Sequence, residues 1–303
     1  MKMEQLELFP DFGIKDDERL YVIGNGFDVH HNIESKYSDF EKWVCKNKDS
    51  NLTNLMDAFF SNARDFWSDI EKALGEYDEG SITDFCEPEN PDDFKYDHPG
   101  QWQDGIEDSI PYIFGEAMDD FRDVFCGWVK SIDITVAKAD MQLPPKSKYL
   151  SFNYTETLER CYHIPEKNVL HIHGNRMNDG DEFVLGHNNN RDENDPYEKA
   201  DTLLPYQNAH SEVIRIMNQW KKATECIIGS HKHFFQSLHI CKAVSVIGLS
   251  YNDIDLPYLR EISTSVASNC KWILYYYSES DYENAENVAN TLGLKDYCLK
   301  KFE

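Results

Sequence analysis

The sequence lacks several features that would assign a protein to a class at once. None of its eight cysteines forms a C-x-x-C pair with another, so we predict neither a zinc ribbon nor a dithiol redox site. No apolar run reaches the ~18 residues that a transmembrane helix needs. The first ten residues hold no apolar segment behind a basic one, so we expect no secretory signal and a soluble protein of the cytoplasm.

Basic residues are also scarce. The chain has 30 Lys and Arg against 55 Asp and Glu, a net charge of -25, and this charge repels the phosphate backbone of nucleic acids. We therefore expect neither a nucleic-acid partner nor a membrane partner. A small anionic ligand remains compatible with the charge, because backbone N–H groups at the start of a helix bind phosphate without a basic side chain.

The composition is that of a folded protein. With 303 residues, of which 41% are hydrophobic and 13% aromatic, the chain is long enough for one α/β domain with an elaboration, or for two small domains. After a polar leader, residues 1–18, the apolar run Leu20–Ile23 predicts a buried strand that stops at a glycine turn.

The second half of the chain repeats this strand pattern. Apolar runs predict strands at residues 149–152, 169–173, 183–185, 243–248 and 272–277, with a helix over 256–267. The last two strands and this helix form a βαβ unit, which requires a parallel sheet. We therefore predict an α/β fold with a Rossmann-like parallel sheet built from residues 19–39 and 140–303.

A large helical insertion follows the first strand. Apolar residues recur at helical spacing over residues 40–139 and predict one long helix from Leu52 to Leu74. Residues 76–108 interrupt this pattern because they are rich in Asp, Glu, Pro and Gly. We interpret that segment as an acidic loop.

The turn after the first strand is a candidate binding site. Gly24 and Gly26, with Asn25 between them, allow a sharp turn and a close approach to a pyrophosphate. Asp28 follows, where it would bond a ribose hydroxyl or cap a helix. The third glycine of the common dinucleotide fingerprint is missing, so an ordinary glycine turn is an alternative of equal weight.

Two other strand ends carry small polar residues. Asn153 ends a predicted strand and offers a donor and an acceptor to a water or a sugar hydroxyl, with a loop-starting Asn as the alternative. Gly248 and Ser250 end another strand, in a polar turn that runs to Asp253 and feeds a helix. Ligands of open parallel sheets bind at the carboxyl ends of the strands, so these residues would share one crevice with the first turn.

Histidines gather near the predicted strand 169–173. His171 and His173 lie on one face if the strand continues, and one of them would serve as a general base. Together with His187 they would also suit a metal ion, whereas histidines bonded to neighbouring carbonyls are the structural alternative. The Lys221–Lys222 pair we interpret as solvated surface.

These segments, taken together, resemble one known family over nearly the whole chain. They are Val22–Asp28, Tyr37–Phe40, Trp67–Glu71, Ser151–Thr155, Ile172–Gly174 and Gly186–His187. In this order they resemble the AbiH family of bacterial phage abortive-infection proteins. Their opening, Gly-Asn-Gly-Phe-Asp, is fairly specific to that pattern.

AbiH proteins in turn resemble the sirtuin-type NAD-binding fold. The resemblance implies that His173 acts as general base, that Asn153 orients the nicotinamide ribose or the attacking water, and that the Gly24 and Ser250 turns hold the diphosphate and ribose. Sirtuins carry an acidic residue where this chain has Thr155, and deacetylating sirtuins carry a zinc ribbon that is absent here. Deacetylation is therefore not implied.

The function implied by the resemblance is that of an antiphage effector that hydrolyses NAD, its substrate, to nicotinamide and ADP-ribose. This NAD glycohydrolase reaction requires no metal. One alternative is a non-catalytic sensor of NAD, ADP-ribose or another nucleotide, and a second is a metal-dependent hydrolase that uses His171, His173 and His187. The partners considered are the nucleotide, a phage trigger of unknown identity and a second copy of the chain in a homo-oligomer.

Overall fold

The computed structural model of the chain describes residues 13–47, 51–63, 65–87, 105, 107–178, 183–191 and 204–302. The chain divides into two compact units. The sheet unit comprises Met1–Ser35, Val129–Val184 and Ala223–Glu303, and the helical unit comprises Lys36–Trp128 and Leu185–Lys222. Residues 185–222, which we expected with the sheet, thus group with the helices.

The sheet unit is built on one six-stranded sheet in which all neighbouring strands are parallel. Its strands are β1 (Arg19–Ile23), β2 (Lys148–Ser151), β3 (Val169–His171), β4 (Ala243–Ile247), β5 (Lys271–Tyr276) and β6 (Tyr297–Lys301). In space their order is β3-β2-β1-β4-β5-β6. The predicted α/β fold with a parallel sheet is confirmed, and the direction of winding reverses between β1 and β4.

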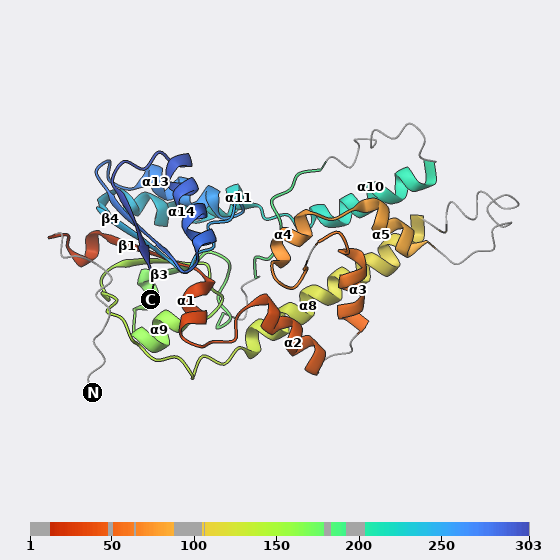
Figure 1. Ribbon diagram of the computed structural model, residues 1–303, viewed down its shortest axis with the longest axis horizontal. Helices are drawn as coiled ribbons and strands as arrows, with labels where there is room; N and C mark the ends of the chain where they lie inside the picture. The colour runs from red at the N-terminus through yellow and green to blue at the C-terminus, as the bar shows by residue number, and fades with distance from the viewer. Residues whose placement is uncertain are drawn as a thin grey trace, which may run out of the picture. The chain divides into compact units, whose positions relative to one another are not determined.

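Helices cover both faces of this sheet, which explains why its central strands are continuous apolar runs. All residues of β1 and β4 are buried, as expected for strands covered on both sides. The covering helices are α1 (Asn25–His30), α9 (Thr157–Tyr162), α12 (Lys232–Gln236), α13 (Leu256–Ser265) and α14 (Glu279–Thr291). Leu20 and Val22 pack with α12, α13 and α14, whereas Tyr21 and Ile23 pack with α1 and α9. In Figure 1, α13 and α14 are drawn above α1 and α9, with the strands beside them.

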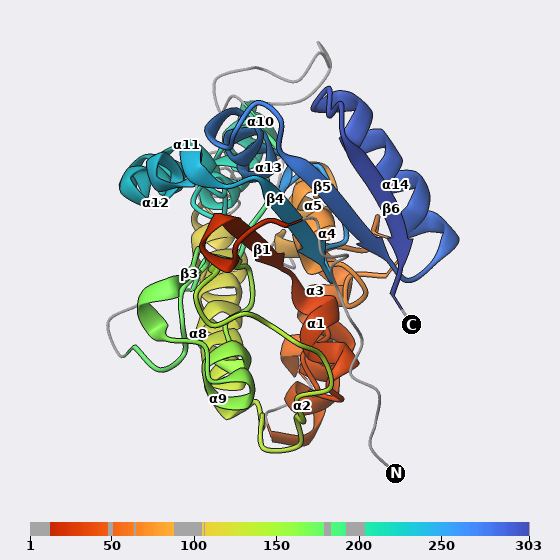
Figure 2. The ribbon, with the colours of Figure 1, turned by 90° about the vertical axis from the view of Figure 1, so that its left-hand side faces the viewer.

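Four further helices lie in the described part of the sheet unit. They are η1 (Asp16–Glu18), η3 (Glu166–Asn168), η4 (Ser237–Ile240) and α11 (Thr224–Ser230). Helix α14 runs beside β5 and β6, the last two strands in the order of the sheet (Figure 2).

The strand predictions need three corrections. Residues 183–185 form no strand in the described part of the chain, where the Val184 N–H donates to the His173 carbonyl (3.0 Å). The strand predicted at 169–173 ends at His171, because the chain turns away at Gly174, which has a φ of +92°. Strand β6 was not predicted, since an edge strand with little burial carries no clear apolar pattern.

The helical unit is held together by aromatic side chains. Its helices are α2 (Tyr37–Asn47), α3 (Asn51–Phe59), α4 (Ile70–Gly75), α5 (Glu79–Cys86), the π-helix η2 (Ile110–Gly115), α8 (Glu116–Ser131), which extends into the sheet unit, and α10 (Leu204–Asn218). Phe40 is fully buried, and its ring lies 5.0 Å from that of Trp128 and 5.6 Å from that of Phe121. Such contacts stabilise a core beyond the burial of their area.

Two helix predictions were wrong in this unit. The single helix from Leu52 to Leu74 is broken into α3 and α4, and the Asp69 side chain caps α4 by accepting the Lys72 N–H (3.1 Å). The apolar spacing conceals the break because Phe66 and Trp67, between the two helices, are also buried. The predicted acidic loop contains α5, and its residues 88–104 and 106 lie outside the described residues.

Lys222 also differs from its prediction as solvated surface. Its side chain is buried, and its Nζ lies 2.6 Å from Glu71 Oε1. A buried ammonium requires such a partner because its desolvation is costly. Lys221 is exposed, as predicted.

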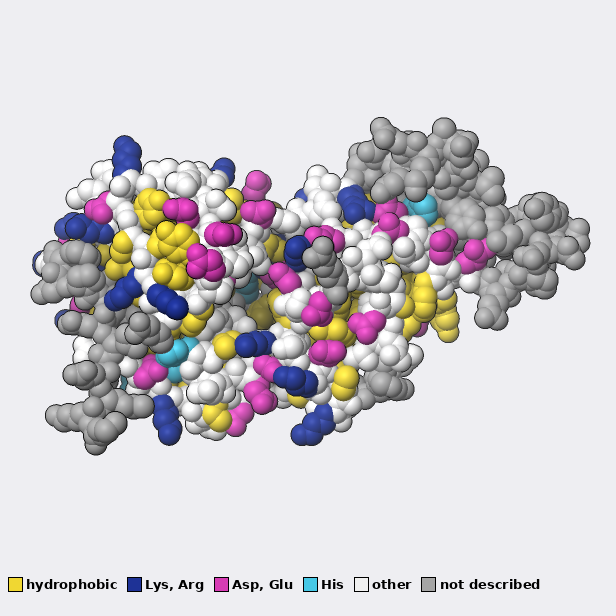
Figure 3. Space-filling view, in the orientation of Figure 1, with side chains coloured by type: hydrophobic (Ala, Val, Ile, Leu, Met, Phe, Trp, Pro, Cys, Tyr) yellow, Lys and Arg dark blue, Asp and Glu magenta, His cyan; other side chains and the backbone are white. Residues whose placement is uncertain are grey.

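The surface reflects the acidic composition. On the face shown in Figure 3, Asp and Glu side chains are spread widely, with Lys and Arg between them. Within the described residues, no helix combines the length and the apolar character that crossing a membrane requires.

Backbone contacts join the ends of β1 and β4 and leave no room for side chains. The N–H groups of Gly24 and Gly26 donate to the carbonyls of Ile247 (2.9 Å) and Gly248 (2.8 Å). A Cβ on Gly24 would lie 2.5 Å from the Gly248 oxygen, and one on Gly248 would lie 2.3 Å from the Phe27 nitrogen. Glycine is therefore required here by the packing of one turn on the other.

Replacing Gly248 by alanine should destabilise the protein more than replacing Gly293. Both residues have a left-handed φ, +70° and +64°, so alanine costs each of them about 1–2 kcal/mol in backbone conformation. Nothing lies within 4 Å of a Cβ on Gly293, whereas overpacking at Gly248 adds about 1–3 kcal/mol. Urea unfolding of the two variants measures the difference, and equal losses would contradict the turn-on-turn contact.

Candidate functional site

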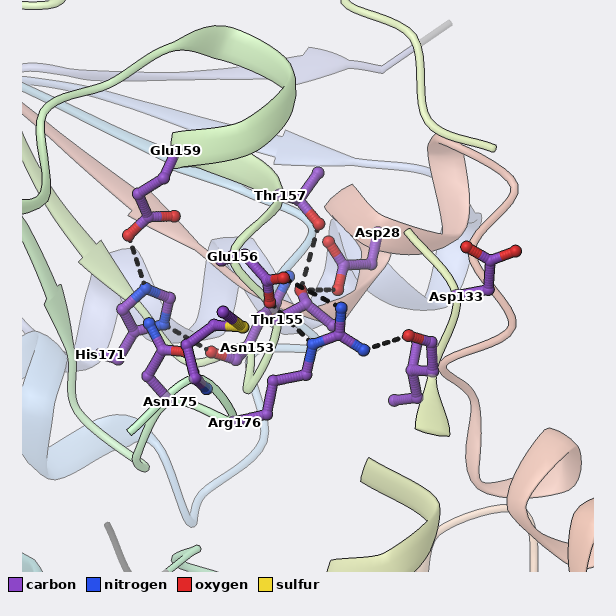
Figure 4. Close-up of polar contacts among 12 residues, drawn as sticks. Asp28, Asp133, Asn153, Thr155, Glu156, Thr157, Glu159, His171, Asn175 and Arg176 are labelled. Atoms are coloured by element: carbon purple, nitrogen blue, oxygen red, sulfur yellow. Dashed lines mark hydrogen bonds and ion pairs between the residues drawn. The ribbon is translucent and has the colours of Figure 1, made fainter. Parts of the chain in front are cut away.

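A group of buried polar side chains lies where β1, β2 and β3 end (Figure 4). Asp28 comes from α1, which follows β1, and Asn153 and Thr155 come from the loop between β2 and α9. His171 is the last residue of β3. Ligands of open parallel sheets bind at this edge, near the point where the winding reverses.

The Asp28 carboxyl group is the most buried of these groups. It is 1% exposed, and its Oδ2 accepts a hydrogen bond from the Thr155 hydroxyl, which lies 3.1 Å from the Thr157 hydroxyl. Its Oδ1 has no hydrogen-bond partner. Burial raises the pKa of Asp28, and the hydroxyls of Thr155 and Thr157 and the amide of Asn153 oppose that rise only in part.

The side-chain amide of Asn153 is likewise buried. It lies near enough to the Asp28 carboxyl group to lower the pKa of that group, but it does not meet it in good hydrogen-bonding geometry. Asn153 is 6% exposed, and neither its Nδ2 nor its Oδ1 reaches a partner in hydrogen-bonding geometry. Leaving such a group unsatisfied costs about 1–3 kcal/mol. A bound water or ligand is the usual reason for an unsatisfied buried amide in a native protein.

The backbone of Asn153 is held by a histidine and a glutamate. His171 Nδ1 donates to the Asn153 carbonyl (2.9 Å), and His171 Nε2 lies 2.9 Å from Glu159 Oε1. Burial lowers the pKa of His171, but the hydrogen bond and the charge of Glu159 outweigh it, so that the pKa is raised. Both ring nitrogens of His171 thus face oxygen atoms, and these contacts hold the backbone of Asn153 in place.

A second ion pair ties the loop after β3 to the loop after β2. The Arg176 guanidinium binds both oxygens of Glu156, at 2.7 and 3.0 Å. The Arg176 backbone N–H donates to the Tyr154 carbonyl (3.0 Å), and its side chain also donates to the carbonyl of Ile132. Neither this pair nor the pair of Glu159 with His171 was predicted, because no spacing in the sequence indicates that these residues meet.

His173 is also buried at this edge. It is 4% exposed, and its ring packs edge-on against Phe152 (5.1 Å between centroids) and at an angle against Tyr258 (5.6 Å). His171 and His173 do not share a strand, because β3 ends at His171. The role of His173 as a general base stays a prediction.

The two glycine turns have internal partners. Gly24, Gly26 and Gly248 pack on one another, and two of their N–H groups are thereby engaged. The Asn25 amide donates to the Ser35 carbonyl (2.9 Å) and accepts from the Ser35 hydroxyl (2.7 Å). These contacts support the alternative in which Gly24 and Gly26 form a structural glycine turn.

Ser250 and Asp253 lie in the loop that follows β4, and both are exposed. Between them, Tyr251 is buried with a φ of +58°, a conformation that a bulky residue adopts only when its surroundings impose it. Its hydroxyl donates to the Tyr275 carbonyl on β5 (2.8 Å). This bond anchors the loop that carries the two predicted residues.

The third histidine of the metal alternative belongs to the helical unit. His187 Nε2 bonds the Met217 carbonyl (3.0 Å), and its Nδ1 accepts the Asn189 N–H (3.2 Å). Such backbone partners are expected if His187 has a structural role and does not bind a metal ion. In the part of the chain that the structure describes, no group of three or more His, Cys, Asp or Glu is arranged to hold a metal ion.

Comparisons with known proteins give one result. The family model described as bacteriophage abortive infection AbiH matches residues 20–276 of the chain. This range includes β1 except for Arg19, all of β2 to β5 and all the candidate site residues. Neither the search of curated proteins nor the search of solved structures found a match.

Replacing Asp28 by asparagine should change how stability depends on pH. Because the pKa of Asp28 is raised above its ordinary value of 3.8, its contribution to stability is complete below pH 3.8 and is lost as the pH rises through the raised pKa. The amide introduced by Asp28→Asn cannot titrate. The free energy of unfolding of the variant should therefore rise relative to that of the wild type by up to about 1.4 kcal/mol per pH unit over this range.

The measurement is urea unfolding of wild type and Asp28→Asn at a series of pH values from 4 upward. Asp120→Asn, at an exposed position in α8, serves as the matched control and should show a constant difference from wild type. A constant difference for Asp28→Asn as well would refute the burial of a titrating carboxyl at this position.

Proposed function

Because this chain belongs to the AbiH family of bacteriophage abortive infection proteins, we propose that it acts in abortive infection by binding NAD and hydrolysing it to nicotinamide and ADP-ribose. The proposed site is the carboxyl edge of the sheet, at the ends of β1, β2 and β3. Loss of NAD would stop the metabolism of the infected cell and with it the production of phage.

The strand order supports a dinucleotide as the ligand. The order β3-β2-β1-β4-β5-β6 is the one that Rossmann-type folds use, and those folds bind dinucleotides across the carboxyl edge where the strand order reverses. In this chain the reversal lies between β1 and β4, and Asn153 lies in the loop that follows β2, the other neighbour of β1. A Rossmann-like fold is thus part of the proposal.

The observation that carries the proposal is the unsatisfied amide of Asn153 beside the Asp28 carboxyl. An amide in this state offers one donor group and one acceptor to a ligand. The ribose hydroxyls of NAD, or a water held against the ribose, match both. Residues His171, Glu159 and Arg176 keep the loop that carries Asn153 in place, so the amide is prepared before a ligand binds.

The reaction needs little from the protein besides binding and proton transfer. The bond from ribose C1′ to the nicotinamide nitrogen breaks, its electron pair neutralises the positively charged ring, and a water oxygen attacks C1′. Asn153 would orient the ribose or the water, and His173 was expected to accept the proton. Two N–H groups in the glycine turns already donate to protein carbonyls. In this proposal the Gly24 and Gly248 turns therefore shape the edge of the sheet.

A non-catalytic nucleotide sensor is the second candidate. It is favoured by the burial of the site, because Asn153 and Asp28 are only 6% and 1% exposed. A closed site of this kind is compatible with tight binding and slow turnover. The two candidates differ in whether NAD is consumed.

The test compares wild type with Asn153→Ala and His173→Ala in phage-challenged cells. We expect wild type to deplete NAD and protect the population, and Asn153→Ala to lower nicotinamide release by about 10²–10⁴-fold, the usual contribution of an orienting group. A loss of the same size in His173→Ala would assign the proton transfer to His173. Mass spectrometry measures the loss of NAD and the release of nicotinamide.

Matched controls are Asn287→Ala and His233→Ala, which change exposed residues of α14 and α12 and should behave as wild type. Protection with undiminished NAD in the wild type would contradict hydrolysis. If the purified protein then still binds NAD and Asn153→Ala abolishes that binding, the sensor is the correct function.

A further inference from the structure

The carboxyl group that faces Asn153 comes from a distant part of the sequence. Thr155, two residues after Asn153, gives its hydroxyl hydrogen to Asp28 Oδ2 and so joins the loop after β2 to α1. Asp28 Oδ1 accepts no hydrogen bond in good geometry, although the Asn153 amide lies near the carboxyl group. Asp28 and Thr155 are 127 positions apart in the sequence, so their contact is a product of the fold alone.

We propose that Asp28 is the catalytic base of this site and that Thr155 is its positioning residue. This inference rests on the proposed NAD hydrolysis. As the C1′–N bond breaks and its electron pair passes to the nicotinamide nitrogen, the water oxygen bonds to C1′. One water proton passes to the Asp28 carboxylate, which then releases it to solvent, and the products are nicotinamide, ADP-ribose and one proton.

The surroundings of the two candidate bases favour Asp28 over His173. The His173 ring packs against the rings of Phe152 and Tyr258, which belong to one of the two apolar cores of the sheet. Asp28 instead faces the amide of Asn153 and two threonine hydroxyls. The group that orients the water and the group that takes its proton must lie together, and this condition holds for Asn153 and Asp28.

Burial also prepares the carboxyl group for proton transfer. A carboxyl with an ordinary pKa is a weak base near neutral pH, and a raised pKa makes it a stronger one. Burial raises the pKa of Asp28, and hydrogen bonds from Thr155 and Thr157 limit the rise. The Thr155 hydroxyl thus sets how far the pKa moves.

Other titratable groups act on Asp28 from α1 and from β3. On α1 itself, burial lowers the pKa of His31. The Nδ1 of His31 donates to the Phe27 carbonyl, and its Nε2 contacts Tyr162 Oη of α9. On β3, His171 interacts with Asp28 electrostatically. Both histidines are present in every variant below, so a change in pH profile reports on Asp28.

The experiment measures nicotinamide release against pH in extracts of phage-challenged cells. We expect activity to rise with pH as Asp28 ionises, and Asp28→Asn to lower the plateau about 10²–10⁴-fold, as for loss of a general base. Thr155→Val removes a hydrogen bond that favours the carboxylate, so the rising limb should move to higher pH by about one unit. Thr155→Ser should restore the wild-type limb.

The control is Thr264→Val, which changes an exposed threonine of α13 whose hydroxyl bonds only within its helix and should leave the limb in place. A purely structural role for Thr155 would lower the plateau without moving the limb, and that result would overturn the proposal. Thermal unfolding verifies that each variant is folded.

The result also separates the two levels of the proposal. Release that survives in Asp28→Asn and is lost in His173→Ala would leave NAD hydrolysis standing and overturn Asp28 as the base. Wild-type extracts that release no nicotinamide during protection would overturn hydrolysis and the base together.

Discussion

The contact between two glycine turns governs the arrangement of the carboxyl edge of the sheet. Gly24, Gly26 and Gly248 meet backbone to backbone, closer than any Cβ would allow. This contact joins the ends of β1 and β4, the two strands between which the winding reverses. It also sets where α1 begins, and α1 carries Asp28 under the loop after β2.

The polar groups at this edge are arranged at a cost to stability. Asp28 and Asn153 are buried with unsatisfied atoms, each of which costs about 1–3 kcal/mol. Two ion pairs, Glu159 with His171 and Glu156 with Arg176, hold the surrounding loops. Unsatisfied groups within so well bonded a frame are consistent with the proposed binding site, because stability is commonly given up for function.

Several features of the fold and the site followed from local patterns. The central strands were predictable because burial on both faces demands continuous apolar runs, and the polar residues predicted at their ends lie at the carboxyl edge of the sheet. The break between α3 and α4 was not predictable, because Phe66 and Trp67 continue the apolar pattern through non-helical chain. Strand β6 was missed because an edge strand depends on its neighbour and not on its own burial.

The sequence by itself thus determined the parallel sheet, the glycine turns and the family, since these depend on residues close together in the chain or on their order along it. Only the tertiary structure decided which side chains meet. The partners of Asp28, of His171 and of Arg176 come from other loops, and no periodicity encodes a contact between distant segments. The glycines illustrate both parts: the sequence marked them as a turn, and the fold showed that they pack against another turn.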